Sequence, residues 1–278
     1  MAPITEERAF SFIPINARNQ KPRHRGLTEI RGTYYSVVGK GYMADLLGML
    51  GEHVDGVKFA GGAFALMPRH TVRDFNEVVH RAEAYVSTGG WIEHILAHGR
   101  SGDVARYLAE AQTLGFDVIE LSTGFISLPA DDLLALVRDV VHAGLRVKPE
   151  LGIQFGAGGS TAAAELAAEG TRDVGWLIGL ARRCIEAGAE RIMIESEGIT
   201  ESVETWRTDV VARIIEGVGL DAVMFEAADP AVFKWYIKNY GSDVNLFVDH
   251  SQTAQLACLR AGIWGTKSSW GRVTTYRP

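Results

Sequence analysis

The sequence predicts an α/β protein built as a single (β/α)8 TIM barrel with an N-terminal extension. About eight times along the chain, a short apolar run ends in a polar or charged residue and is followed by a helical stretch. Strands that alternate with helices favour a parallel sheet, and eight such units fit a closed barrel. The length of 278 residues is also close to the roughly 250 that such a barrel commonly uses as one domain.

The expected strands are the short apolar runs, and the expected helices lie between them. The strands are 27–31, 56–60, 84–88, 117–120, 145–148, 191–195, 222–226 and 244–249. The helices are 43–51, 69–83, a segment from about 91, 104–114, 129–142, 161–168, 172–188, 201–217, 229–240 and 251–261. Pro68 suits a helix start and Gly115 a helix end. Asp131 and Asp132 favour the first turn of a helix electrostatically.

We expect one catalytic domain over residues 26–265, between an N-terminal arm (1–25) and a C-terminal tail (266–278). Residues 152–170 are rich in Gly and Ala and contain no Lys or Arg. This segment is the longest weakly structured stretch, so it is either a lid over the site or a mobile surface loop.

Composition restricts the class of partner and the compartment. A hydrophobic share of 47% suits a large core, and a net charge of -6 argues mildly against a nucleic-acid partner but not against a small anionic substrate. Cys184 and Cys258 fit buried free thiols in a reducing compartment. The first 20 residues lack a signal-peptide pattern, and no apolar run is long enough for a membrane span. We therefore expect a cytoplasmic protein without a membrane partner.

The polar residues at the strand ends indicate an enzyme. The carboxyl ends of barrel strands converge on one face, where active sites lie. Around one cavity the sequence therefore places Arg31, Lys58, Thr88, Glu120, Lys148, Glu195, Glu226 and Asp249.

Two lysines and three glutamates of this set suggest specific chemistry. Lys58 and Lys148 end apolar strands, where they can neutralise a carboxylate or phosphate, donate a proton, or form core ion pairs with Glu120 or Glu150. Glu120, Glu195 and Glu226 suit a Mg²⁺ site. The alternatives for these glutamates are general acid–base catalysis and salt bridges to Arg31, Lys58 and Lys148.

Two glycine pairs follow neighbouring strands. Gly61-Gly62 and Gly89-Gly90 allow backbone N–H groups to approach an anion, and Thr88 adds a hydroxyl; plain tight turns are the alternative. In Asp249-His250-Ser251, Asp249 suits a helix cap, and His250 suits substrate binding or proton transfer. No nucleophile elbow accompanies them, which argues against a hydrolytic triad.

Several stretches resemble the phosphosulfolactate synthase family. They are Val57–Gly62, Ser87–Glu93, Gly115–Ser122, Met224–Ala227 and Val244–Leu246, and the resemblance runs from about Gly26 to Gly265. The stretches Thr28–Arg31, Val86–Trp91 and Asn245–Gln252 are closer to a branch of plant heat-stress-associated relatives and their microbial cousins.

The resemblance implies a carbon–sulfur lyase that adds sulfite to phosphoenolpyruvate with Mg²⁺. Positions that match the family pattern are Lys58, Gly61, Gly62, Gly89, Gly90, Glu93, Glu120, Ser122, Glu150, Glu195, Glu226 and Asn245. The predicted catalytic residues are Lys58, Lys148, Glu120, His250 and Arg31. The predicted substrate-binding residues are Gly61, Gly62, Thr88, Gly89, Gly90, Ser122 and Asn245. The predicted Mg²⁺ ligands are Glu120, Glu195 and Glu226.

The chain departs from the family pattern where the synthases carry positive charge. Ile153 and Gln154 stand in place of a basic pair, and Glu197 stands in place of an arginine. The first strand ends near Arg31-Gly32 instead of Asp-Lys-Gly. Arg31, Lys148, His250 and Arg272 are the candidates to compensate. Since a glutamate near a phosphate is repulsive, a less anionic substrate is an open alternative.

Three functions remain open on the sequence. The first is the synthase reaction, and the second is another addition, elimination or isomerisation on a small, non-phosphorylated carboxylate. The third is a non-catalytic stress or interaction protein. In each case we expect a homo-oligomer.

Overall fold

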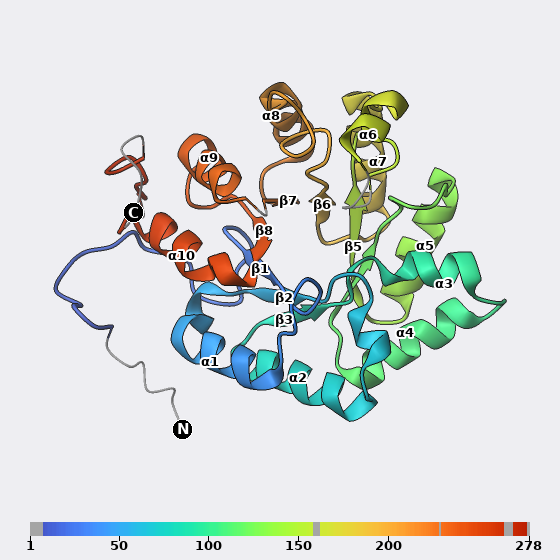
Figure 1. Cartoon of the computed structure of the whole chain (residues 1–278), viewed down its shortest axis with the longest axis horizontal. Coiled ribbons are helices and arrows are strands. Elements are labelled where there is room, and N and C mark those ends of the chain that lie inside the picture. The colour runs from blue at the N-terminus through green and yellow to red at the C-terminus, as the bar shows by residue number, and fades with distance from the viewer. Residues whose placement is uncertain (1–7, 158–161, 228, 264–268, 277–278) are drawn as a thin grey trace.

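The fold is a closed barrel of eight parallel strands, as the sequence predicts (Figure 1). The computed structural model describes residues 8–157, 162–227, 229–263 and 269–276. Each strand pairs in parallel with the next, and β8 pairs with β1. The strands are β1 (Thr28–Arg31), β2 (Gly56–Lys58), β3 (Tyr85–Ser87), β4 (Val118–Leu121), β5 (Arg146–Leu151), β6 (Ile192–Ile194), β7 (Val223–Glu226) and β8 (Leu246–Asp249).

Helices surround the strands on the outside of the barrel (Figure 1). The α-helices are α1 (Lys40–Leu50), α2 (Arg69–Arg81), α3 (Ile92–His98), α4 (Asp103–Leu114), α5 (Ala130–His142), α6 (Ala163–Glu169), α7 (Val174–Glu186), α8 (Thr208–Val218), α9 (Pro230–Tyr240) and α10 (Thr253–Ala261). Short 3-10 helices span Gly51–His53, Ala63–Leu66, Gly89–Trp91 and His250–Gln252. None of the helices in the described part of the chain has the length and apolar character that crossing a membrane requires.

Alternation along the strands separates the outer core from the barrel interior. Ile192 and Ile194 of β6 belong to the large core packed against the helices, whereas Met193 belongs to a separate small cluster with Leu27, Met224 and Phe247. Successive strand residues point to opposite faces, so this small cluster fills the interior. The same alternation carries Glu29, Glu120 and Lys148 inward.

Two expectations about the elements need correction. The helix predicted at 201–217 begins only at Thr208, because the carbonyl of Ser196 accepts hydrogen bonds from the amides of Thr200 and Glu201 and forms a turn. Ser202 has a φ of 56°, a left-handed conformation that a helix does not contain. Of the two cysteines, Cys184 is buried, but Cys258 is only partly buried.

The chain before β1 contacts the amino end of the barrel. Lys21 donates to the carbonyls of Gly51 and Ala82, both at 2.7 Å, and Arg23 pairs with Asp55 at 2.8 Å. Within the segment proposed as a lid, α6 lies close to the predicted range 161–168, while residues 158–161 lie outside the described residues.

Candidate active site

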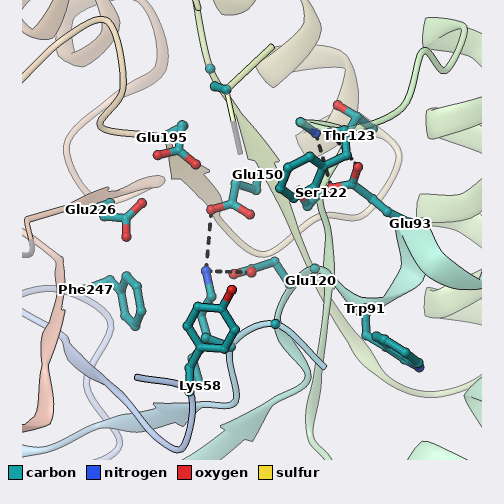
Figure 2. Close-up of a pocket in the computed structure, with 18 of the residues that line it drawn as sticks. Lys58, Trp91, Glu93, Glu120, Ser122, Thr123, Glu150, Glu195, Glu226 and Phe247 are labelled. Carbon is teal, nitrogen blue, oxygen red and sulfur yellow. Dashed lines mark hydrogen bonds and ion pairs between the residues drawn. The ribbon is translucent and has the colours of Figure 1, made fainter. Parts of the chain in front are cut away.

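A cavity of about 540 Å³ lies at the carboxyl ends of the strands (Figure 2). Each of the eight strands, or the loop after it, contributes to the wall. Of the residues predicted for the site, those that line it are Arg31, Lys58, Gly61, Gly90, Glu120, Ser122, Glu195 and Glu226. Lining residues outside the predicted set include Glu93, Glu150, Gln154, Arg172, Glu201 and Phe247.

A row of buried charges crosses the barrel beneath this cavity. Lys148 forms ion pairs with Glu29 and, at 3.1 Å, with Glu120. Glu120 also pairs with Lys58 at 2.6 Å, and Lys58 lies 3.4 Å from Glu150 (Figure 2). Glu120 and Lys148 face each other on β4 and β5, so the sheet register itself brings them together. Both lysines therefore form the ion pairs with Glu120 or Glu150 that the sequence suggests as one of their possible roles.

The row holds Lys58 and Glu120 in their charged forms. Burial opposes the charge on Lys58, but Glu120 and Glu150 outweigh it and raise the pKa of the ammonium above its usual range. Burial likewise opposes the charge on Glu120, and Lys58 and Lys148 keep the pKa of this carboxyl low. Lys58 is thus a fixed positive charge at the cavity floor rather than a proton donor.

Three glutamates converge next to Lys58. Carboxylate oxygens of Glu150, Glu195 and Glu226 all lie within 4.8 Å of one another. Oxygen ligands at such spacing are what Mg²⁺ or another hard cation prefers. The sequence predicts Glu120 as the third ligand with Glu195 and Glu226, but Lys58 and Lys148 occupy its oxygens. Glu150, two residues after Lys148 on the same inward face of β5, takes its place in the cluster.

The like charges in this cluster favour protonated carboxyls. Burial and the neighbouring Glu120 raise the pKa of Glu150 to about 8. Burial, Glu226 and Glu150 raise the pKa of Glu195 well above its usual value, and Glu195 shares a hydrogen bond with Glu226. A divalent cation would relieve this repulsion, so the residues present fit a metal ion.

Arg31 contacts both the glutamate cluster and the aromatic ring of Phe247. It pairs with Glu226 at 2.8 Å and lies 3.9 Å from Asp249. Its guanidinium carbon lies 5.1 Å from the ring centroid of Phe247, and the Lys58 nitrogen lies 4.5 Å from the same centroid. Phe247 therefore contacts both cations and limits their access to water.

Glu93 anchors the loop after β4 (Figure 2). Its carboxylate accepts hydrogen bonds from the hydroxyl of Ser122 and from the amides of Gly124, at 3.2 Å, and Phe125, at 2.7 Å. The predicted substrate-binding residue Ser122 lines the cavity, but its hydroxyl is already engaged in this anchor. Glu93 is thus a positioning residue for the cavity wall.

One glycine of each pair lines the cavity, and the other allows close packing behind it. Gly61 and Gly90 line the cavity. A Cβ on Gly89 would lie 2.1 Å from the carbonyl oxygen of Phe59, and one on Gly62 would lie 1.9 Å from the Trp91 ring. Both residues also have positive φ values, 62° and 68°. The tight-turn alternative therefore accounts for Gly62 and Gly89.

Thr88 and Asn245, both predicted to bind substrate, do not line the cavity in the described structure. The Thr88 hydroxyl accepts a hydrogen bond from the amide of Glu120 and donates one to the carbonyl of Gly89. It therefore stabilises the backbone behind the cavity wall. Asn245 binds the amide of Leu27 and the carbonyl of Val223, at the amino ends of the strands. This placement does not fit a substrate-binding role for Asn245, because the cavity lies at the opposite, carboxyl end of the barrel.

His250 lies on the outside of the β8 end. Its ring nitrogens contact the hydroxyls of Tyr42 at 2.8 Å and Ser36 at 3.2 Å. Asp249 accepts from the amide of Ser251 and caps the following 3-10 helix, as the sequence predicts. The structure does not bring the His250 side chain to the cavity wall.

The residues that depart from the family pattern have structural roles. Ile153 is fully buried in the core, and the Gln154 amide donates to the carbonyls of Leu166 and Gly170 at 2.7 and 2.9 Å. Glu197 is buried close to the turn after β6. Arg172 is not among the compensating residues that the sequence suggests, yet it lines the cavity.

The raised pKa of Glu150 predicts how stability depends on pH without metal. The pKa of Glu150 is about 8 in the folded protein, which is higher than in the unfolded protein. The stabilisation of the fold by Glu150 is therefore complete below about pH 4.5 and is lost as pH rises to about 8. We expect the free energy of unfolding to fall by on the order of a few kcal/mol across this range. Urea denaturation in chelator at several pH values checks this. Glu150→Gln should flatten the dependence; an unchanged slope would contradict the assignment.

Taken together, the fold and the site define a (β/α)8 barrel with an acidic, lysine-bearing cavity at its carboxyl face, the place where enzymes of this architecture carry their active sites. The model of the (2R)-phospho-3-sulfolactate synthase (ComA) family matches residues 16–266. The chain therefore belongs to this family.

Two relatives and one solved structure illustrate the similarity. The chain is 39% identical over 260 residues to the protein HEAT-STRESS-ASSOCIATED 32 of Arabidopsis thaliana, covering 90% of this chain and 91% of that protein. It is 25% identical over 264 residues to phosphosulfolactate synthase of Methanothermobacter thermautotrophicus, covering 92% and 96%. N-acetylneuraminate lyase from Mycoplasma synoviae has the same fold, with a TM-score of 0.52, 12% identity, and coverage of 86% of this chain and 74% of that one.

Proposed function

We propose that this protein is a divalent-cation-dependent lyase that adds a nucleophile to a small unsaturated carboxylate, or removes one from it. The observation that carries this proposal is the convergence of Glu150, Glu195 and Glu226 next to the buried cation Lys58. Membership of the phosphosulfolactate synthase family supports a reaction of this type.

A metal at the glutamate cluster would act as a Lewis acid on the substrate carboxylate. When a nucleophile bonds to the carbon of the double bond that lies farther from the carboxylate, the electron pair of that double bond moves onto the carboxylate as negative charge. Lys58 stabilises this charge, because its ammonium stays protonated throughout and lies in a buried site. Protonation of the carbon next to the carboxylate completes the addition. Elimination is the reverse of these steps.

The charge of the cavity favours a substrate with fewer negative charges than a phosphorylated one. Among the described lining residues there are six glutamates, against the cations Arg31, Lys58 and Arg172. Arg31 and Lys58 are already paired with carboxylates. A non-phosphorylated carboxylate is therefore our first candidate, with Mg²⁺ as the cation. Addition of sulfite to phosphoenolpyruvate is the second candidate, and the family match favours it.

Calorimetry with two ligands separates these candidates. Oxalate mimics a planar enolate without a phosphate, and phosphoenolpyruvate carries the phosphate. We expect Mg²⁺-dependent binding of oxalate, weakened about 100-fold or more in Lys58→Met, since a buried cation facing the developing charge is worth that much. The matched control is Lys40→Met, because Lys40 pairs with Asp74 on the surface and lies outside the cavity wall.

Each outcome has a distinct meaning. Binding of oxalate but not of phosphoenolpyruvate supports the non-phosphorylated substrate. Mg²⁺-dependent binding of both ligands supports the synthase reaction and calls for a sulfite-coupled assay. Absence of binding for both ligands contradicts the proposed lyase and favours a non-catalytic role.

A further inference from the structure

Arg172 differs from the other two cations of the cavity wall. Arg31 and Lys58 have carboxylate partners, whereas no carboxylate lies within ion-pair distance of Arg172 among residues 8–157, 162–227, 229–263 and 269–276. Its only polar side-chain contact within those ranges is a 3.5 Å hydrogen bond to the carbonyl of Gln154. With respect to that part of the chain, most of the donors of this guanidinium are therefore available to a ligand.

Aromatic rings hold the Arg172 side chain instead of charges. The guanidinium carbon lies 4.3 Å from the ring centroid of Phe155 and 5.0 Å from that of Trp176. Phe155 and Trp176 are 40% and 45% exposed as residues. A guanidinium on ring faces keeps its full charge while its edge stays open for hydrogen bonding.

The backbone around Arg172 is fixed on both sides. The Arg172 amide donates to the carbonyl of Ile153 at 2.6 Å, and the amide of Phe155 donates to the carbonyl of Gly170 at 3.1 Å. Gln154 and Thr171 form an antiparallel bridge between these contacts. The segment thus presents Arg172 at the cavity wall, beside the loop that follows Glu150 and β5.

We propose that Arg172 is the anion-recognition residue of this cavity and binds a second oxyanionic group of the substrate, such as a carboxylate or a sulfonate. This inference deepens the proposed function and rests on it for the reaction, but not for the anion site. The substrate class is then a small acid with two separate anionic groups, one at the glutamate cluster and one at the guanidinium fork.

The charge and burial of Arg172 agree with this role. Burial without a carboxylate partner lowers the pKa of Arg172, so pairing with an oxyanion stabilises its charged form. Gln154 supplies no charge, and its amide is engaged by backbone carbonyls. The positive charge for an anionic ligand thus comes from the segment before α7 rather than from the loop after β5.

The test titrates the whole metal-free protein with sulfate and, separately, with malonate at constant ionic strength. We expect wild-type dissociation constants in the millimolar range, weakened about 10- to 100-fold in Arg172→Gln. Arg172→Lys should fall between the two, because it keeps the charge but loses the fork. The matched control is Arg146→Gln, because Arg146 also contacts an aromatic ring, Tyr85, but lines a separate cavity at the amino end.

A spectroscopic readout separates a local anion site from a general loss of structure. Because Trp176 contacts the guanidinium, anion binding should change its fluorescence, and Trp176→Phe, which keeps an aromatic ring at this position, should remove the change. Equal affinity in wild type and Arg172→Gln would overturn the proposal, as would absence of binding to wild type at about 50 mM. Malonate binding without sulfate binding assigns a carboxylate, and the reverse assigns a sulfonate. Since no Mg²⁺ is present, the result stands apart from the oxalate experiment.

Discussion

Lys148→Met is expected to lower the free energy of unfolding by about 3–5 kcal/mol. Lys148 is buried between Glu29 and Glu120, and both carboxylates are fully buried. Removing the ammonium takes from Glu29 the cation with which it forms its ion pair, and a buried charge without its partner is costly. Methionine fills nearly the same volume, so the loss measures charge rather than packing.

Urea or thermal denaturation at neutral pH measures this effect. Met193→Leu is the packing control, because Met193 is buried in the same interior and should cost less than about 1.5 kcal/mol. The double variant Glu29→Gln/Lys148→Met should recover about 1–3 kcal/mol relative to the sum of the single changes. If Lys148→Met were as stable as Met193→Leu, the row of charges would contribute nothing to stability.

Glu195→Gln is expected to weaken divalent-cation binding by about 100-fold or more. The amide keeps the shape of the carboxyl but removes one anionic ligand from the cluster with Glu150 and Glu226. Without metal, the same variant should be more stable than wild type at alkaline pH, because burial and like-charge repulsion raise the pKa of Glu195. Loss of binding together with a gain in stability distinguishes a ligand from a structural residue.

Calorimetry with Mg²⁺ and Mn²⁺ checks this prediction, with Glu201→Gln as the matched control. Glu201 also lines the cavity, but it accepts a hydrogen bond from Ser196 and lies outside the three-carboxylate cluster. Its variant should keep wild-type affinity within about 3-fold. Equal losses in both variants would show a general effect of cavity charge rather than a defined site.

Much of the fold is predictable because its signals are local. A run such as Arg191–Glu195 is apolar over the span of one strand and ends in a charge, and parallel strands must align their ends at one face. Strand ends alone therefore predict that Lys58, Glu120, Glu195 and Glu226 meet at one cavity, and all four line it.

The differences from the sequence prediction have separate causes. Glu120 and Glu150 both reach the barrel interior, but only the register of β4 against β5 pairs Glu120 with Lys148 and leaves Glu150 for the glutamate cluster. Arg172 precedes a helix and has no strand-end signal, so no local pattern places it at the cavity. Asn245 directly precedes β8 and therefore lies at the amino end of the barrel, whereas the site lies at the carboxyl end.

The sequence by itself thus determined the barrel, its large core and five of the eight polar residues expected around the cavity, because periodicity and strand ends are properties of neighbouring residues. The tertiary structure alone decided which carboxylates pair with lysines, which three converge on one point, and which arginine lines the cavity on aromatic rings instead of carboxylates. Those outcomes depend on strand register and on distances of a few ångströms between residues far apart in the chain, and electrostatic energies change steeply over such distances.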